Sequence, residues 1–414
     1  MFTKFQLATA LTKAIEEKGF TKPTDVQAKT IPEILEGKDV LVGAETGSGK
    51  TIAYLLPLLQ KLILQRAKSG VNWGKGNHVR ALILVPTREL AQQVRDETLF
   101  FAQRIYPKMT CKAVYGGVDL ESQIRNLATG SEVLVATPAR VMRMLENKAI
   151  KFDKLRTVIV DEADRMVSKS FKEELERVLE ELPPERQSLL FTATLPDSIR
   201  WLVRELLDAP VIINIDDTTE ERIEERVVTV NRGKKLALLQ HLLETEDWKQ
   251  VLVFATSKKS CSKLYRELSE EHDDVAVLHS NLPQKVRSEA IEKFKEGKAR
   301  VLICTDVAAR GLDVEALPCV INYELPREPN DYTHRIGRTG RAGNAGMAIS
   351  LIAHHEYAHF DVIEKRIGMR LERERVEGFE AAAKAPSAPN SAKKDKKKKT
   401  KRNKVSKKKK SKKA

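Results

Sequence analysis

A glycine-rich stretch between an apolar run and a helical pattern has the composition of a phosphate-binding loop. It consists of Ala44, Glu45, Thr46, Gly47, Ser48, Gly49, Lys50 and Thr51. Gly47 and Gly49 permit backbone angles and close approaches that a Cβ would forbid, and the amide groups of such a loop attract an anion. Lys50 can reach the β and γ phosphates of a nucleotide, and the Thr51 hydroxyl can bind Mg²⁺. Although Ala44 replaces the first glycine of the usual pattern, the flanking segments favour a phosphate loop over a chance glycine turn.

A second apolar run, at 158–160, ends in the sequence D-E-A-D, which starts at Asp161. Ligands of α/β sheets lie at the carboxyl ends of the strands. In a phosphate-loop enzyme we therefore expect Asp161 to complete the Mg²⁺ shell and Glu162 to orient the attacking water. The four residues alone are also compatible with a solvated acidic turn, and it is the upstream loop that favours the catalytic interpretation.

Two arginines near the end of the chain lie in the stretch H-R-I-G-R-T-G-R, which starts at His334. If this segment is helical, Arg338 and Arg341 lie on one face and can reach across a cleft. Arginines in that position stabilise the charge on a transferring phosphoryl group and raise the rate by roughly 10³ to 10⁵. The alternative is a basic surface cluster that binds nucleic acid without catalysis, and we favour the first interpretation.

The elements that must position these residues follow a regular alternation of short apolar runs and helical patterns. The runs are 40–43, 81–85, 111–115, 133–136, 157–160, 189–191, 211–215, 227–230, 251–254, 275–279, 301–305, 319–322 and 348–352. Such runs suit parallel strands buried on both faces. The alternation predicts an α/β protein with two domains, each with a mostly parallel sheet, at 1–208 and 217–370. A hinge is expected at 209–216, continuing into the acidic stretch 216–221.

The composition supports two globular domains. The chain has 414 residues, of which 41% are hydrophobic, and this length is sufficient for two full-sized cores. The sequence shows no transmembrane segment and no signal peptide, so we expect no membrane association and no export. The four cysteines form no C-x-x-C pair, which predicts reduced, buried thiols. The second half contains no glycine-lysine phosphate loop, so one nucleotide site is expected, closed by the second domain.

Taken together, the motifs resemble the full set of the DEAD-box RNA helicases, in order and with the family's spacing. They are Gly19 to Gln27, residues 44–51, Pro86 to Ala91, Gly116-Gly117, Thr137 to Arg140, D-E-A-D, Thr192 to Thr194, Thr305 to Asp313 and His334 to Arg341. The resemblance covers residues 2–370 and departs from the family at Thr192, usually Ser, and at Ala139, often Gly. It implies two tandem RecA-like domains that use ATP and Mg²⁺ and act on RNA.

The resemblance also implies roles around the nucleotide. Gln27 would bind adenine through its amide and reject guanine, which offers acceptors at both positions. Phe2 and Lys22 would contact the base, and Asp313 the ribose. Asp164, Thr192, Thr194 and His334 would couple hydrolysis to domain closure. A lone glutamine is otherwise a surface residue, and buried hydroxyls and carboxylates often satisfy only local backbone groups.

RNA contacts are implied on both domains. On the first they are Pro86, Thr87, Arg88, Gly117, Thr137 and Arg140, and on the second Phe254, Gln284, Arg287, Thr305 and Arg310. Family members grip the sugar-phosphate backbone, so binding should tolerate sequence changes and weaken with salt. ATP and RNA would bind across the cleft and favour the closed state together, which separates short duplexes locally.

The residues after 370 are expected to form a disordered tail. Between Lys393 and Lys413 there are 15 basic residues and one acid, which hold +14 of the net charge of +15. The tail could serve solubility or targeting, or it could anchor RNA non-specifically, and we favour the anchor.

Three alternatives remain open at this point. They are an ATP-dependent RNA clamp or remodeller of RNA–protein complexes, a non-catalytic RNA chaperone, and a DNA helicase. The compact core followed by a lysine tail resembles bacterial cytoplasmic members, with a monomeric core and roles in ribosome assembly or RNA decay. A eukaryotic nucleolar protein could have a similar tail.

Overall fold

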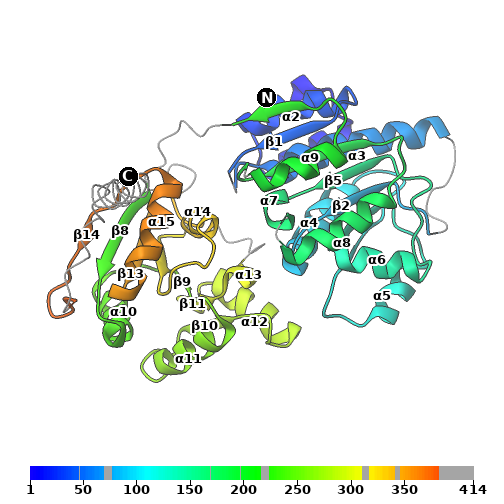
Figure 1. Cartoon of the computed structure of the whole chain (residues 1–414). Coiled ribbons are helices and arrows are strands. Elements are labelled where there is room, and N and C mark those ends of the chain that lie inside the picture. The colour runs from blue at the N-terminus through cyan, green and yellow to red at the C-terminus, as the bar shows by residue number, and fades with distance from the viewer. Residues whose placement is uncertain are drawn as a thin grey trace, which may run out of the picture.

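The computed structural model describes residues 1–45, 47–69, 77–167, 169–195, 197–215, 223–309, 317–340 and 346–381. The described residues form two α/β domains, each built on a seven-stranded sheet with helices on both faces (Figure 1). Every strand pairing is parallel. The predicted fold class, two tandem domains with parallel sheets, is confirmed.

The first domain carries the phosphate loop. Its sheet has the order β3-β4-β2-β5-β6-β1-β7. The strands are β1 (Val40–Gly43), β2 (Ala81–Leu84), β3 (Cys111–Val114), β4 (Val133–Ala136), β5 (Thr157–Val160), β6 (Gln187–Thr192) and β7 (Val211–Asn214). The helices are α1 (Thr9–Glu17), α2 (Asp25–Leu35), α3 (Lys50–Ser69), α4 (Arg88–Ala102), α5 (Leu120–Leu127), α6 (Pro138–Glu146), α7 (Ala163–Met166), α8 (Lys169–Glu180) and α9 (Arg200–Leu206).

Both faces of this sheet are buried because successive side chains of its apolar strands point to opposite sides. Val40 and Val42 pack into the core formed with α1 to α4, whereas Leu41 packs into the core formed with α6, α8 and α9. The carboxyl ends of β1, β2 and β5 consequently lie at one edge of the sheet. This edge holds the phosphate loop and the D-E-A-D stretch.

The second domain repeats the arrangement, with the order β10-β11-β9-β12-β13-β8-β14. Its strands are β8 (Ile223–Thr229), β9 (Val251–Phe254), β10 (Val275–Leu278), β11 (Val301–Cys304), β12 (Cys319–Asn322), β13 (Gly346–Ile352) and β14 (Arg373–Glu374). Its helices are α10 (Lys235–Thr245), α11 (Lys258–Ser269), α12 (Gln284–Lys295), α13 (Asp306–Ala309), α14 (Asn330–Ile336) and α15 (Tyr357–Ile367). Because α14 follows β12, it can place its side chains opposite α7 of the first domain.

Two predicted boundaries need correction. The segment 209–216 is not wholly a linker, because β7 lies within it and pairs with β1 through apolar residues such as Ile213. The acidic stretch 216–221 lies outside the described residues. The second domain also extends past 370: Arg373 and Glu374 form β14 beside β8, and Phe379 packs against the core. The tail from 382 onward, with its lysine-rich part, lies outside the described residues.

All four cysteines are free and buried, which confirms the predicted reduced thiols. Among the described residues, no helix combines the length and the apolar composition needed to cross a bilayer.

Candidate functional site

The glycine loop has the backbone that the sequence predicts. Gly47 and Gly49 have φ angles of 84° and 89°, which side chains rarely adopt. A Cβ on Gly49 would lie 2.4 Å from Nε2 of Gln27, so the close approach of α2 also requires glycine there. The loop leads directly into α3, whose first two residues are Lys50 and Thr51. Thr46 lies outside the described residues.

Lys50 is held inside the loop. Its ammonium group donates to the carbonyl oxygens of Ala44, at 2.6 Å, and Glu45, at 2.5 Å. The Ser48 hydroxyl closes the turn by donating to the Glu45 carbonyl, at 2.8 Å. The cationic group is therefore positioned over the loop that the sequence assigns to phosphate.

The turn before α2 contacts the phosphate loop through its side chains. Thr24 and Gln27 form a capping box, in which Oε1 of Gln27 accepts from the Thr24 amide at 3.0 Å. Nε2 of Gln27 donates to the Gly49 carbonyl, at 3.2 Å, and the Thr24 hydroxyl donates to the Ser48 carbonyl, at 2.8 Å. Both ends of the Gln27 amide thus have protein partners. The binding of adenine by Gln27 stays a prediction. It requires the Gln27 amide to exchange these protein partners for the base.

The two residues expected to contact the base differ in exposure. Phe2 lies in a short 3-10 helix, is buried, and packs edge-on against Phe5 with ring centroids 6.1 Å apart. Lys22 is exposed. Asp313, expected at the ribose, lies outside the described residues.

Asp161 is fixed by a tyrosine that the sequence analysis missed. Its Oδ2 accepts from the hydroxyl of Tyr54, at 2.9 Å, and its Oδ1 accepts from the Glu162 amide, at 2.8 Å. Burial raises the pKa of Asp161, an effect that the nearby Lys50 charge and the Tyr54 hydrogen bond oppose. Tyr54 lies one helical turn after Lys50 on α3, so the two side chains share a face of the helix. A tyrosine hydroxyl on the same face as the lysine of the phosphate loop was the sequence signal that could have identified Tyr54.

Glu162 adopts an unusual backbone conformation. Its φ and ψ angles are 50° and 48°, in the left-handed region, where it precedes α7. Its Oε2 is buried and has no hydrogen-bond partner among the described residues. Such a conformation and an unsatisfied buried acceptor both cost free energy, and they occur most often at functional sites.

A hydroxyl-to-imidazole chain crosses from the first domain to the second. Thr192 donates its hydroxyl to the Thr194 carbonyl, at 2.6 Å, and the Thr194 hydroxyl donates to Oδ2 of Asp164, at 2.9 Å. Nε2 of His334, on α14, lies 3.2 Å from the same oxygen. The structure therefore brings together all four residues that the sequence proposes as coupling elements.

Burial alone would raise the pKa of Asp164, but the hydrogen bond and charge of His334, with Arg165 and Thr194, lower it to about 2. Burial lowers the pKa of His334 in spite of Asp164. The chain thus ends in a carboxylate beside a neutral imidazole at neutral pH.

The arginine stretch is not one continuous helix. The helix α14 ends at Ile336 with Gly337 as its cap, and Thr339 instead bridges to Leu317 and donates its hydroxyl to the Leu317 carbonyl. Arg338 lies beyond the end of α14, so the helical condition for placing Arg338 and Arg341 on one face is not met there, and Arg341 lies outside the described residues. Arg338 is buried and faces a pocket between the domains.

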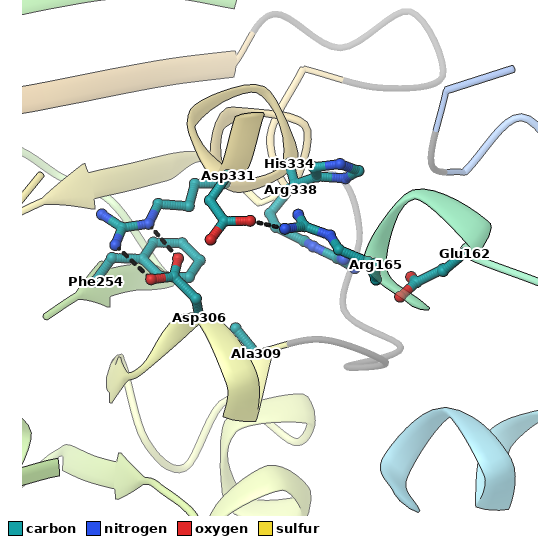
Figure 2. A pocket seen from close by; sticks show the side chains of 9 residues that line it. Glu162, Arg165, Phe254, Asp306, Ala309, Asp331, His334 and Arg338 are labelled. Carbon is teal, nitrogen blue, oxygen red and sulfur yellow. Dashed lines mark hydrogen bonds and ion pairs between the residues drawn. The ribbon is translucent and has the colours of Figure 1, made fainter. Parts of the chain in front are cut away.

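That pocket is lined by two of the side chains that the sequence assigns to catalysis, Glu162 on the first domain and Arg338 on the second. It is partly open to solvent, has a cavity volume of about 20 Å³, and is drawn in Figure 2. Its lining includes Glu162 and Arg165 from the first domain and His334 and Arg338 from the second. Arg335 already has protein partners. Its guanidinium donates two hydrogen bonds to the Asp306 carboxylate and others to the Asn322 side chain and the Glu324 carbonyl.

Two further side-chain contacts cross the interface at residues expected to bind RNA. Arg88 donates to Oε1 of Gln284, at 3.1 Å, and Glu89 forms an ion pair with Arg287. Gly117 has a φ of 80°, and a Cβ there would lie 2.8 Å from the Arg88 guanidinium. Glu89 was missed by the sequence analysis, although it directly follows Arg88.

Arg287 is 2% exposed, and its Nε and Nη1 have no hydrogen-bond partner among the described residues. Two buried donors without partners at an interface mark a place where an anion could be bound.

The remaining residues expected at RNA have local roles in the structure. Thr87 caps α4 by accepting from the Leu90 amide, Thr137 precedes α6, and Thr305 caps α13. Pro86 is buried, and Arg140 donates to the Val118 carbonyl, at 3.0 Å. Arg310 lies outside the described residues.

The ring of Phe254, which was also expected at RNA, is enclosed by the fold. It is 2% exposed because β9 is a central strand, and the Arg335 guanidinium lies over its ring, 4.8 Å from the centroid.

Comparisons with known proteins agree with this geometry. Residues 24–202 match the family model described as DEAD/DEAH box helicase, and residues 234–343 match the helicase conserved C-terminal domain. The chain is 38% identical over 373 residues to the ATP-dependent RNA helicase CshA of Listeria monocytogenes, covering 90% of this chain and 69% of that protein.

Two solved structures are similar across both domains. Mss116p, with its NTE and C-tail deleted and bound to ssRNA and AMP-PNP, matches with a TM-score of 0.80 and 30% identity, over 91% of this chain and 78% of that one. S. cerevisiae Dbp5 bound to RNA and ADP BeF3 matches with a TM-score of 0.79 and 28% identity, over 91% and 95% of the two chains. The arrangement of the two domains therefore resembles that of proteins holding RNA and a nucleotide together.

Proposed function

The chain belongs to the DEAD-box family of helicases, and from this premise we propose that it couples ATP hydrolysis to closure of its two domains on single-stranded RNA. It is an ATP-dependent RNA helicase. Its specific action in this proposal is the local separation of short RNA duplexes or the remodelling of RNA–protein complexes. We further propose that it works in the cytoplasm, in ribosome assembly or RNA decay.

One observation carries the proposal. Glu162 and Arg338, from different domains, line the same pocket, and Asp164 meets His334 beside it. Neither domain alone holds this set, so hydrolysis would depend on closure. RNA that favours the closed state would then stimulate hydrolysis, and RNA and ATP would raise each other's binding affinity by the same factor.

On the first domain, the proposed nucleotide site uses the loop from Ala44 to Thr51. Lys50 would exchange its carbonyl partners for the β and γ phosphates. The carboxylate of Asp161 and the hydroxyl of Thr51 are hard oxygen donors that suit Mg²⁺, which neutralises phosphate charge when bound. Gln27 and Lys22 would select adenine at the turn before α2, with Phe2 as a buried support.

Removing the Tyr54 hydroxyl should weaken use of Mg²⁺. Tyr54→Phe keeps the ring that packs 5.1 Å from Phe191 but leaves Oδ2 of Asp161 without its donor. Groups that orient a metal ligand typically change metal affinity 10- to 100-fold. We expect the Mg²⁺ concentration for half-maximal ATP hydrolysis to rise about tenfold. Tyr265→Phe, on α11 of the second domain, is the control and should leave this Mg²⁺ concentration unchanged. The same half-maximal Mg²⁺ concentration for the native chain and both variants would contradict the role of Tyr54.

The residues that we propose to bind RNA lie on both domains, on either side of the interface. Arg88 and Gly117 lie on the first domain, and Gln284 and Arg287 on the second. We propose that RNA phosphates occupy the two unpartnered donors of Arg287 and displace Arg88 from Gln284. Contacts of this kind recognise the backbone and not the bases.

Acidification should weaken closure. His334 is neutral at neutral pH, because burial and the nearby Arg165 charge lower its pKa in the closed state below the usual 6.5, against the opposing effects of Asp164 and Glu162. Once the domains separate, His334 regains an ordinary pKa and takes up a proton first, so closure loses stability as pH falls below about 6.5. RNA affinity with a non-hydrolysable ATP analogue should therefore fall between pH 7.5 and 5.5. His334→Gln should reduce this pH dependence, and an identical dependence would exclude His334 as its source.

The lysine tail should act as an RNA anchor. Truncation before Lys393 removes 15 basic residues and should lower RNA affinity and flatten its dependence on salt. ATP turnover at saturating RNA should change little, because the core is intact. RNA titrations at several salt concentrations test this, and an unchanged slope would show that the tail does not contact RNA.

The main test is ATP hydrolysis with no nucleic acid, with single-stranded RNA and with single-stranded DNA, for the native chain and for Glu162→Gln. Stimulation by RNA only, lost in the variant, supports the proposal. Equal rates with and without RNA would contradict the coupling. A strand-displacement assay then separates duplex unwinding from an RNA clamp that closes without separating strands.

A further inference from the structure

Another ion pair crosses the domain interface, beside the contact between Asp164 and His334. The guanidinium of Arg165, on α7, pairs with the carboxylate of Asp331, on α14 (Figure 2). The side chains are only 10% and 7% exposed, so both charges are largely removed from water. The sequence analysis assigns no role to either residue.

The two contacts connect the same two helices, α7 and α14. Asp164 and Arg165 are neighbours on α7, whereas Asp331 and His334 lie one turn apart on α14 and share a face. Asp164 faces His334, and Arg165 faces Asp331. Sliding α14 by one turn would oppose Asp164 with Asp331, which are two acids. The charges therefore define one register between the helices.

Each member of the new pair has a sign opposite to that of its own surroundings. Arg165 follows an acidic group that consists of Asp161, Glu162 and Asp164. Asp331 precedes a basic group that consists of His334, Arg335 and Arg338. The pair thus balances charge within each domain as well as between them. A change of either residue would upset this balance next to the reacting groups.

We propose that Arg165 and Asp331 are positioning residues that hold the closed arrangement in which Glu162 and Arg338 face one pocket. This inference rests on the proposed function, because the arrangement affects turnover only if ATP is hydrolysed between the domains. Both side chains regain water when the domains separate, so a lost partner penalises the closed state specifically. The pair therefore acts on the closing equilibrium and leaves the fold of each domain intact.

A double-mutant cycle tests the pair. Arg165→Met and Asp331→Asn each break this buried ion pair across the interface, and each should lower RNA-stimulated turnover roughly 100-fold. The double variant removes both charges, so its loss should be smaller than the product of the single losses by about tenfold or more. Losses that simply multiply would show that the two residues act independently, which would overturn the proposal. Arg165→Lys keeps the charge and should restore most of the turnover.

Closure itself provides the second readout. The four native cysteines are buried, so dyes can be directed to Glu121→Cys on the first domain and Glu270→Cys on the second. With RNA and a non-hydrolysable ATP analogue, energy transfer should report fewer closed molecules for each single variant. Normal closure with reduced turnover would overturn a positioning role.

Arg177→Met is the matched control. Arg177 lies on α8 and pairs with Glu146 at 3.1 Å, but both side chains are exposed and belong to the first domain. It should change neither turnover nor closure. A native chain without RNA-stimulated hydrolysis would refute the proposed function itself, whereas a stimulated native chain with multiplicative losses would refute only the role of this pair.

Discussion

Replacing Arg338 with alanine is expected to lower RNA-stimulated ATP hydrolysis by roughly 10³- to 10⁵-fold, the range found for arginines that contact a transferring phosphoryl group. Arg338 is a buried cation from the second domain that faces the pocket shared with Glu162. Because it approaches from outside the nucleotide-binding domain, it should contribute mainly in the closed state. ATP affinity should change far less than turnover.

Single-turnover hydrolysis at saturating RNA, together with a fluorescent-nucleotide titration, separates these two effects. Arg338→Lys should recover only part of the rate, since an ammonium lacks the fork of donors that matches phosphate oxygens. Arg266→Ala, an exposed arginine on α11, is the matched control and should behave as the native chain does. A loss below tenfold for Arg338→Ala would exclude Arg338 from the reacting centre.

Replacing Glu162 with glutamine is expected to slow ATP hydrolysis by about 10²- to 10⁴-fold, the usual contribution of a positioned base. The change removes one charge and keeps the shape, so the backbone amide that donates to Asp161 should remain in place. Oε2 of Glu162 is buried without a hydrogen-bond partner among the described residues, which leaves it available to a water molecule.

The variant should also retain RNA longer. If hydrolysis releases RNA, then blocking it prolongs the closed complex formed with ATP. Dissociation of labelled single-stranded RNA should be slower for Glu162→Gln than for the native chain when ATP is present. Glu173→Gln, at an exposed position on α8, should leave both rates unchanged. Rapid release without hydrolysis would contradict the proposed link between the two steps.

The local parts of this protein follow from its sequence. The predicted strands at 40–43, 133–136, 157–160, 251–254 and 319–322 have the observed bounds, because short apolar runs between helical patterns suit strands of a parallel sheet that is buried on both faces. Gly47 and Gly49 take the positive φ angles that their residue type allows. The motif positions of Asp161, Glu162 and Asp164 directly after β5 follow from the same pattern.

Some segments departed from the local pattern for identifiable reasons. The helix α14 ends at Ile336 because Thr339 bridges to Leu317, and a pairing partner 22 residues away cannot be detected from helical periodicity. The strand β14 is formed by Arg373 and Glu374, which are polar residues paired along the edge of β8. Phe254 looks like an available aromatic in the sequence but is enclosed by the central position of its strand.

By itself, the sequence determined which segments form strands and which residues could bind phosphate, since both properties depend on neighbouring residues and backbone geometry. The tertiary structure alone decided which side chains meet. Tyr54 reaches Asp161, Glu89 reaches Arg287 and Arg165 reaches Asp331 only because parallel strands bring distant loops to one edge and because the two domains pack together. Such contacts join residues separated by about a hundred positions or more, and their energies depend on burial, which no local pattern of residues records.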